Sequence, residues 1–240
     1  MTWLWRICFS GVGIIPALAA SLTGTVRLSE SADPGVRKHL DFSGVVVWLE
    51  PLGSQRAAPV PSNAPRAKMV QKDKRFTPHV LAIPTGAMVD FPNYDPIFHN
   101  AFSSFSGQIF DLGLYAPGST RAVAFKRSGV VRVFCNIHPA MSAVIVVLDT
   151  PWFAVSELSG AFQIRNLPPG EYRLRVFHER ATGSTLEALA RRVALNSEDL
   201  ALPPISISET GYLETSHKNK FGRDYPSAGD DHVLYNGGHK

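Results

Sequence analysis

The sequence predicts an all-β protein made of two sandwich-type domains. Helical periodicity is scarce along the 240 residues, whereas short runs of alternating or β-branched residues recur. Gly, Pro, Asn, Asp or Ser residues bound these runs, and the chain contains 19 Gly and 18 Pro, as expected where turns join many short strands. The predicted strands are residues 23–28, 44–49, 79–83, 88–91, 122–125, 130–134 and 143–148.

The N-terminus has the pattern of a signal peptide. Arg6 is the only charged residue before a mostly apolar run, which ends in the small residues Ala17-Leu18-Ala19-Ala20. The run is shorter than the roughly 20 residues that a membrane-spanning helix needs, and a short apolar run followed by small residues is typical of export and cleavage. We therefore expect residues 1–20 to be removed and the mature protein to be periplasmic, without stable membrane insertion.

The charge balance argues against nucleic-acid binding. The chain carries 24 Lys and Arg against 20 Asp and Glu, a net charge of +4. The basic residues are scattered rather than gathered into a stripe, whereas nucleic-acid binders show a clustered basic surface. Neither a Ser-His-Asp arrangement nor a Gly-rich phosphate loop is evident.

The most informative stretch is residues 135–141, Cys-Asn-Ile-His-Pro-Ala-Met, which follows a predicted strand. Cys8 lies within the signal peptide, so Cys135 is the one cysteine expected in the mature chain and has no internal disulfide partner. A thiolate, two imidazoles and a weak axial thioether are the ligands of a trigonal copper site. Cys135, His138 and Met141 supply three of these four groups. The alternative is a buried structural thiol, a common role of free cysteine.

The second imidazole must come from another strand, because one short loop cannot surround a metal ion. His99 is the best candidate, since it follows the predicted strand 88–91 and lies 36 residues before Cys135. His79 is an alternative ligand, although a histidine at the start of a strand is more often structural. For His178, ion pairing or packing is expected rather than metal binding.

These residues give the chain a resemblance to the cupredoxins, whose pattern is an upstream His, often followed by Asn, and a later Cys-x-x-His with Met close behind. His99-Asn100 and Cys135-x-x-His138-Pro139-x-Met141 match this pattern. The chain also resembles bacterial cupredoxin-type proteins labelled methylamine-utilisation proteins. The resemblance implies a Greek-key β-sandwich at residues 21–149, with its core at about 70–149. It also implies one type 1 copper and an Asn100 side chain that bonds the backbone near Cys135. The strands 23–28 and 44–49 could join either domain.

A second domain is expected at residues 150–211. Phe162 and Ile164 alternate, Pro168-Pro169-Gly170 suggests a turn, and Tyr172 begins a second alternating run, the pattern of a hairpin with one buried face. This segment resembles the small transthyretin-like or carboxypeptidase-regulatory-like β-sandwich modules. Residues 212–240 are polar and are expected to form a mobile tail.

Together these features predict a periplasmic blue copper protein that transfers single electrons and is not an enzyme in its own right. The resemblance implies that a redox partner protein docks near His138 and Pro139; the sequence does not fix the oligomeric state. The alternatives are a copper carrier or sensor without electron transfer, and a metal-free structural β-sandwich protein. A copper oxidase or nitrite reductase is a further alternative, but such enzymes need another copper centre, typically with His-x-His pairs, and the chain contains no His-x-His.

Overall fold

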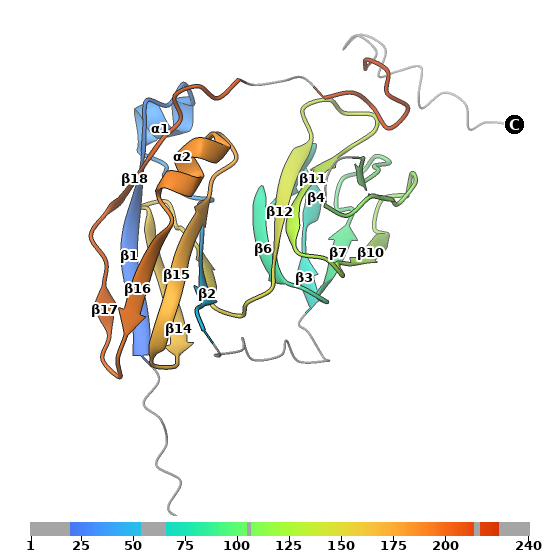
Figure 1. Cartoon of the computed structure of the whole chain (residues 1–240). Coiled ribbons are helices and arrows are strands. Elements are labelled where there is room, and N and C mark those ends of the chain that lie inside the picture. Colours follow the sequence, from blue (N-terminus) through green and yellow to red (C-terminus); the bar gives the residue numbers. More distant parts are fainter. Residues whose placement is uncertain (1–19, 54–65, 105–106, 214–216, 226–240) are drawn as a thin grey trace, which may run out of the picture.

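The computed structural model of the chain describes residues 20–53, 66–104, 107–213 and 217–225. Both of its lobes are built from β-strands, and the helices among these residues are two short ones, α1 (Pro34–His39) and α2 (Gly183–Ala188) (Figure 1). The predicted all-β class is therefore confirmed. The predicted signal peptide lies outside the described residues except for Ala20. Within the described part, neither helix has the length and apolar character needed to cross a membrane.

The first lobe, here called the central sandwich, is formed by residues 66–149. One sheet has the strand order β10-β7-β3, a second has the order β6-β12-β11-β8-β9, and β4 and β5 pair with each other. Apolar side chains from both sheets, including Phe91, Val133 and Ile145, form its core. The strands are β3 (Arg66–Lys68), β4 (Val70–Lys72), β5 (Arg75–Thr77), β6 (Val80–Pro84), β7 (Met88–Pro92), β8 (Phe102–Ser103), β9 (Phe110–Asp111), β10 (Thr120–Ala124), β11 (Gly129–Phe134) and β12 (Ser142–Leu148).

The second lobe is assembled from two separate chain segments, residues 20–53 and 150–213, and is called the split sandwich. Its sheets have the orders β14-β1-β17, with β18 also on β1, and β13-β2-β15-β16. Its strands are β1 (Ala20–Ser29), β2 (Val46–Pro51), β13 (Phe153–Val155), β14 (Ala161–Leu167), β15 (Gly170–Phe177), β16 (Arg191–Leu195), β17 (Leu200–Ala201) and β18 (Ile205–Ser208).

This assembly corrects the expected domain boundaries, because residues 21–53 do not belong to the central sandwich. β1 lies between β14 and the β17 and β18 strands, and β2 lies between β13 and β15. Leu22 from β1 and Leu49 from β2 are fully buried in the same core as Leu174. Burial of these side chains between the two sheets decides which strands β1 and β2 pair with. The alternation of apolar residues along the two strands does not reveal these partners. The second domain therefore does not simply follow the first, since the central sandwich is inserted into it.

The expected hairpin at residues 160–176 is also wrong. β14 pairs with β1, whereas β15 pairs with β2 and β16 in the other sheet. Phe162 and Tyr172 both face the core of the split sandwich, so the two strands oppose each other across that core. The connection contains Pro168 and Pro169, which have no backbone N–H with which to start a hairpin ladder. The resemblance of this lobe to carboxypeptidase-regulatory-like modules stays a prediction.

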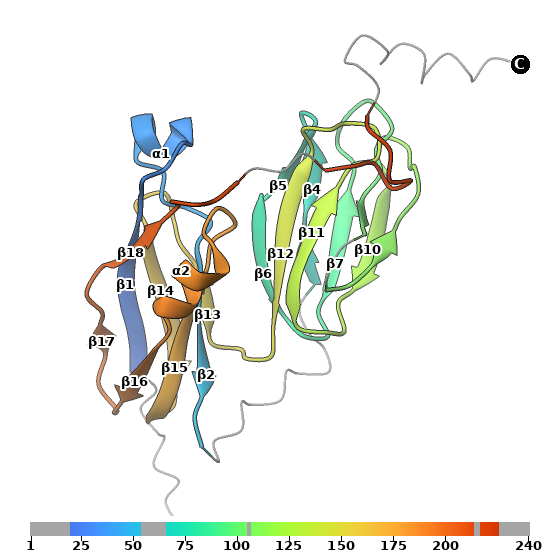
Figure 2. The ribbon, with the colours of Figure 1, turned by 45° about the horizontal axis from the view of Figure 1, so that its top comes forward.

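The two lobes pack sheet against sheet. Val46 on β2 is buried together with Val144, Val146 and Leu148 on β12. Both faces of β12 are therefore covered, because the alternate residue Ile145 points into the core of the central sandwich. Figures 1 and 2 show β12 and β6 on the side of the central sandwich that faces β2 and β13.

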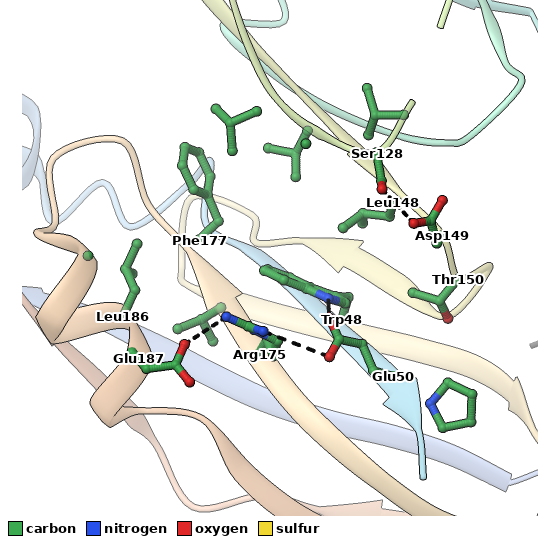
Figure 3. Close-up of a pocket in the computed structure, with 17 residues that line it drawn as sticks. Trp48, Glu50, Ser128, Leu148, Asp149, Thr150, Arg175, Phe177, Leu186 and Glu187 are labelled. Carbon is green, nitrogen blue, oxygen red and sulfur yellow. Dashed lines mark hydrogen bonds and ion pairs between the residues drawn. The ribbon is translucent and has the colours of Figure 1, made fainter. Parts of the chain in front are cut away.

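A cavity of about 630 Å³ lies along this contact and is partly walled by Trp48 and Phe177 (Figure 3). Arg175 in the cavity forms an ion pair with Glu187, with a nitrogen–oxygen distance of 2.7 Å, and also lies 3.9 Å from Glu50. The Trp48 indole N–H donates to Glu50. These polar groups of the cavity are thus already engaged with protein partners.

Candidate metal centre

The four predicted ligand residues meet at one end of the central sandwich. His99 lies between β7 and β8, and its backbone exchanges two hydrogen bonds with Tyr115, at 3.2 and 2.9 Å. Cys135 directly follows β11, whose last residue, Phe134, pairs with Phe102 on β8. The strand pairing of β8 with β11 therefore brings the His99 segment beside the residue 135–141 loop.

The side-chain donor atoms form a small triangle. Cys135 Sγ lies 3.9 Å from His99 Nδ1 and 3.7 Å from His138 Nδ1, and the three ligand atoms lie within 4.8 Å of one another. Bonds of about 2.0 Å to nitrogen and about 2.3 Å to sulfur, the values found in zinc sites, would separate these atoms by about 3.7 Å at an angle of about 120°. The two sulfur–nitrogen distances therefore suit one metal ion that Cys135, His99 and His138 would hold together.

The fourth residue, Met141, is placed by the turn of the loop itself. The Cys135 N–H donates to the Met141 carbonyl at 3.1 Å, and the Met141 N–H donates to the His138 carbonyl at 3.0 Å. Met141 has no exposed surface and packs in the same apolar core as Cys135. A thioether thus accompanies a thiol and two imidazoles inside a water-poor site, the donor set of a type 1 copper centre.

The environment of Cys135 opposes ionisation in the absence of a metal. Burial raises the pKa of the Cys135 thiol, while backbone N–H groups of Ile137, Asn100 and His138 lower it, and the net shift is upward. The same N–H groups are placed to stabilise a thiolate once a cation is present. Metal binding must therefore release the thiol proton.

Asp95 orients His99, and the sequence pattern does not single it out. Its carboxylate accepts a hydrogen bond from His99 Nε2 at 2.7 Å, which leaves Nδ1 facing the sulfur. Burial raises the pKa of Asp95, but hydrogen bonds from the Lys74 N–H, His99 and the Asp73 N–H outweigh this effect and the net shift is downward. Burial lowers the pKa of His99 more than Asp95 raises it. A carboxylate behind a histidine of this kind is typical of metal sites.

Asn100 is part of the site, but its predicted hydrogen bond is wrong. Its side-chain amide donates to Asp111 at 2.7 Å and to the Gly113 carbonyl at 2.9 Å, rather than binding the backbone near Cys135. The link to Cys135 runs through the Asn100 backbone N–H, which points at the sulfur. Asn100 thus fixes the segment before β8, because Asp111 and Gly113 lie on the chain segment opposite it.

The alternative histidine ligands have other partners. His79 Nδ1 lies 3.0 Å from the Ser142 carbonyl oxygen, and His79 forms an ion pair with Glu179 at 2.7 Å. His178 pairs with Glu209 at 2.9 Å. Both pairs support a structural role for these two histidines. His138 is buried, with 6% of its surface exposed, whereas Pro139 beside it is exposed.

Comparisons with known proteins find similarity to solved cupredoxin structures. A purple cupredoxin from Nitrosopumilus maritimus is 23% identical over 34% of this chain and 99% of its own, with a TM-score of 0.32. Amicyanin from Paracoccus versutus is 19% identical over 42% of this chain and 97% of its own, with a TM-score of 0.33. A copper-containing nitrite reductase from Thermus scotoductus is 22% identical, and the match spans 51% of this chain but only 28% of the reductase, with a TM-score of 0.33.

No protein-family model and no curated protein sequence matches the chain. The residues of the site, rather than these similarities, indicate the function of the protein.

Proposed function

We propose that the protein is a type 1 copper protein that carries single electrons between redox partners and is not itself an enzyme. The observation that carries the proposal is the buried triangle of Cys135 Sγ, His99 Nδ1 and His138 Nδ1, closed by the loop that ends in Met141. Sulfur and imidazole donors favour copper over hard cations. When bound, copper would alternate between Cu(I) and Cu(II) and so carry one electron at a time.

The surroundings of the site support this role because they hold the donors still. Asp95 fixes the orientation of His99, and the two backbone hydrogen bonds of Met141 fix the turn of the loop. Ligands that are held in place by hydrogen bonds and core packing rearrange little when the charge at the site changes. A small rearrangement is what rapid gain and loss of one electron requires.

The arrangement also favours a single redox centre over a multi-copper enzyme. Within the described residues, one group of three or more His, Cys, Asp or Glu side chains is placed to hold a metal ion, and it is this one. A second copper centre, as an oxidase or nitrite reductase requires, would need another such group.

We further propose that a redox partner docks at the exposed surface around Pro139 and Ala140, in the periplasm. Phe98, next to the ligand His99, is 46% exposed, and Leu114 is 55% exposed. Exposed apolar residues grouped at one end of a protein commonly mark an interaction surface.

Voltammetry of the copper-loaded mature protein tests the proposal. We expect a reversible one-electron couple that persists over repeated cycles, because the same four residues would retain the ion in both oxidation states. A carrier would lose its copper during cycling, and a metal-free structural protein would retain none after dialysis; either result would overturn the proposal. The Cys135→Ser variant is the matched control and should lose the couple while keeping the fold.

A further inference from the structure

A segment near the C-terminus, residues 217–225, lies against the loop of residues 135–141, here called the metal-binding loop. The chain runs from β18 of the split sandwich toward the β11–β12 end of the central sandwich, and the two views agree on this placement (Figures 1 and 2). We call this segment the strap. Its position differs from the expected mobile tail, because these residues make specific contacts with another lobe.

Three hydrogen bonds join the strap to the loop. The Tyr225 hydroxyl donates to the Cys135 carbonyl at 2.8 Å, and His217 Nε2 donates to the Pro139 carbonyl at 2.8 Å. The Lys220 N–H donates to the Asn136 side-chain oxygen at 3.0 Å. The loop residues that accept these bonds lie on both sides of His138, so the strap restrains both of its flanks.

Ring packing and an ion pair add to these bonds. The His217 ring stacks on Phe134, with centroids 4.0 Å apart and planes inclined by 27°, and meets the Tyr225 ring edge-on. Lys220 Nζ pairs with Asp111 at 2.7 Å, the carboxylate that also accepts from Asn100. The strap therefore contacts the metal-binding loop and also the segment that holds Asn100 in place.

We propose that Tyr225 and His217 are positioning residues of the metal centre, and that the strap holds the ligand loop closed over Cys135. The strap binds the backbone carbonyls of Cys135 and Pro139, and so acts on the position of the loop rather than on the metal directly. The effect of the strap on a copper site rests on the proposed function. The closure of the loop does not, because it is a property of the metal-free protein and can be tested in that protein.

The first test measures how fast an aromatic disulfide reagent attacks the Cys135 thiol in the full-length mature apoprotein. In the His217→Ala, Tyr225→Phe double variant we expect attack at least about tenfold faster than in the wild type, because two hydrogen bonds that close the loop are lost. Arg223→Ala is the control, since Arg223 lies in the strap and contacts Asn219 through its own backbone. The Arg223 N–H donates to the Asn219 side-chain oxygen, and the Arg223 carbonyl accepts from the Asn219 N–H. This variant should react at the wild-type rate.

A rate for the double variant within twofold of the wild type would overturn the inference, as would an equal acceleration in Arg223→Ala. A chain that ends at residue 213 lacks the whole strap, and its thiol should also react faster than that of the wild type. Near-ultraviolet circular dichroism verifies that this shortened chain and the double variant stay folded.

The second test uses the copper-loaded protein and the Tyr225→Phe variant alone. A positioning role predicts a shifted or broadened thiolate-to-copper absorption band with full copper occupancy, and a band identical to that of the wild type would contradict that role. If copper does not bind but the thiol becomes more reactive in the double variant, the proposed function is wrong and the role of the strap in closing the loop is supported. If copper binds but the thiol reactivity of the double variant is unchanged, the proposed function is supported and the role of the strap is wrong.

Discussion

At the residue scale, the hydrogen bond between Asp95 and His99 decides which histidine nitrogen faces Cys135. Asp95 is held ionised by the backbone N–H groups of Asp73 and Lys74, at 2.6 and 2.9 Å. An ionised carboxylate accepts a hydrogen bond from the Nε2–H group of His99 and so leaves the Nδ1 lone pair free for a metal. Asp95 therefore links the backbone of Asp73 and Lys74 to the orientation of the His99 ring.

Asp95→Asn should weaken copper binding by about 10- to 100-fold, as is typical when a carboxylate behind a metal-binding histidine is removed. Competition titration with a chelator of known affinity measures the change. Asp90→Asn is the control, because Asp90 lies in the same sandwich and pairs with Arg66 instead. Equal losses in the two variants would mean that Asp95 has no specific effect on His99.

A second residue pair, His79 and Glu179, links the two lobes and makes their contact depend on pH. The hydrogen bond to Glu179 raises the pKa of His79 above its ordinary 6.5. Burial raises the pKa of Glu179, but the bond to His79 outweighs this and lowers it below its ordinary 4.5. The contribution of His79 is thus present below pH 6.5 and is lost as the pH rises through its folded-state pKa. The contribution of Glu179 is lost as the pH falls below about 4.5.

The free energy of unfolding of the wild type should therefore fall, relative to that of Glu179→Gln, as the pH rises from 6.5 through the raised folded-state pKa of His79. Urea denaturation at several pH values measures the difference. The effect should be small, since 48% of the His79 side chain is exposed and water screens the pair. Parallel stability profiles for the two proteins would show that the ion pair does not contribute.

The ligand residues could be predicted because their chemistry is local in the sequence, whereas their supports could not. Cys135, His138 and Met141 lie within seven residues, and this combination of donor types at this spacing is typical of a copper-binding loop. Asp95 is one of many acidic residues near loops, and only the fold shows that it reaches His99. The Tyr225 contact joins residues 90 positions apart, and the polar composition of the tail gives no sign of it.

At the scale of elements, the short apolar strands were predictable but their partners were not. β12 has a continuous run of apolar residues, and such a run is expected where both faces of a strand are buried. The sequence does not show that its second face meets β2 of the split sandwich. The hairpin prediction for β14 and β15 failed for the same reason, since opposed strands across a core have the same alternation as paired strands.

The turn before β14 provides a test of strand packing in the split sandwich. Gly160 has a φ of +82°, and a Cβ atom there would lie 2.2 Å from the Val26 carbonyl oxygen on β1. Gly211 has the same φ of +82°, but a Cβ atom there would meet its nearest neighbour, Thr182, at 3.5 Å. The two glycines therefore share the backbone strain and differ in the clash.

Gly211→Ala should cost about 1–2 kcal/mol of stability from the left-handed backbone alone. Gly160→Ala should cost at least about 2 kcal/mol more, because the backbone of β1 must move. Thermal and chemical denaturation measure both values. Equal losses would show that β1 and the Gly160 turn are not packed as described.

At the scale of the whole molecule, the split sandwich depends on chain segments from both sides of the central sandwich. β1 and β2 occupy interior positions in its two sheets. A fragment with residues 150–213 alone would expose the core-facing sides of both sheets and lack their central strands.

This fragment should therefore be unfolded, in contrast to the expectation that residues 150–211 form an independent module. Far-ultraviolet circular dichroism and the dispersion of amide proton resonances should show a disordered chain. A single-chain variant that joins residues 20–53 directly to 150–213 is the matched control and should fold. A well-folded fragment of residues 150–213 would contradict the arrangement.

The proposed function requires that His99, Cys135, His138 and Met141 form a type 1 copper centre. The most direct measurement is the visible absorption and electron paramagnetic resonance spectrum of the mature protein after loading with Cu(II). We predict an intense thiolate-to-copper absorption band together with a narrow copper hyperfine splitting, both absent in Cys135→Ala. Weak colour with an ordinary wide splitting would mean that the thiolate does not bind Cu(II) in this geometry, and would contradict the claim.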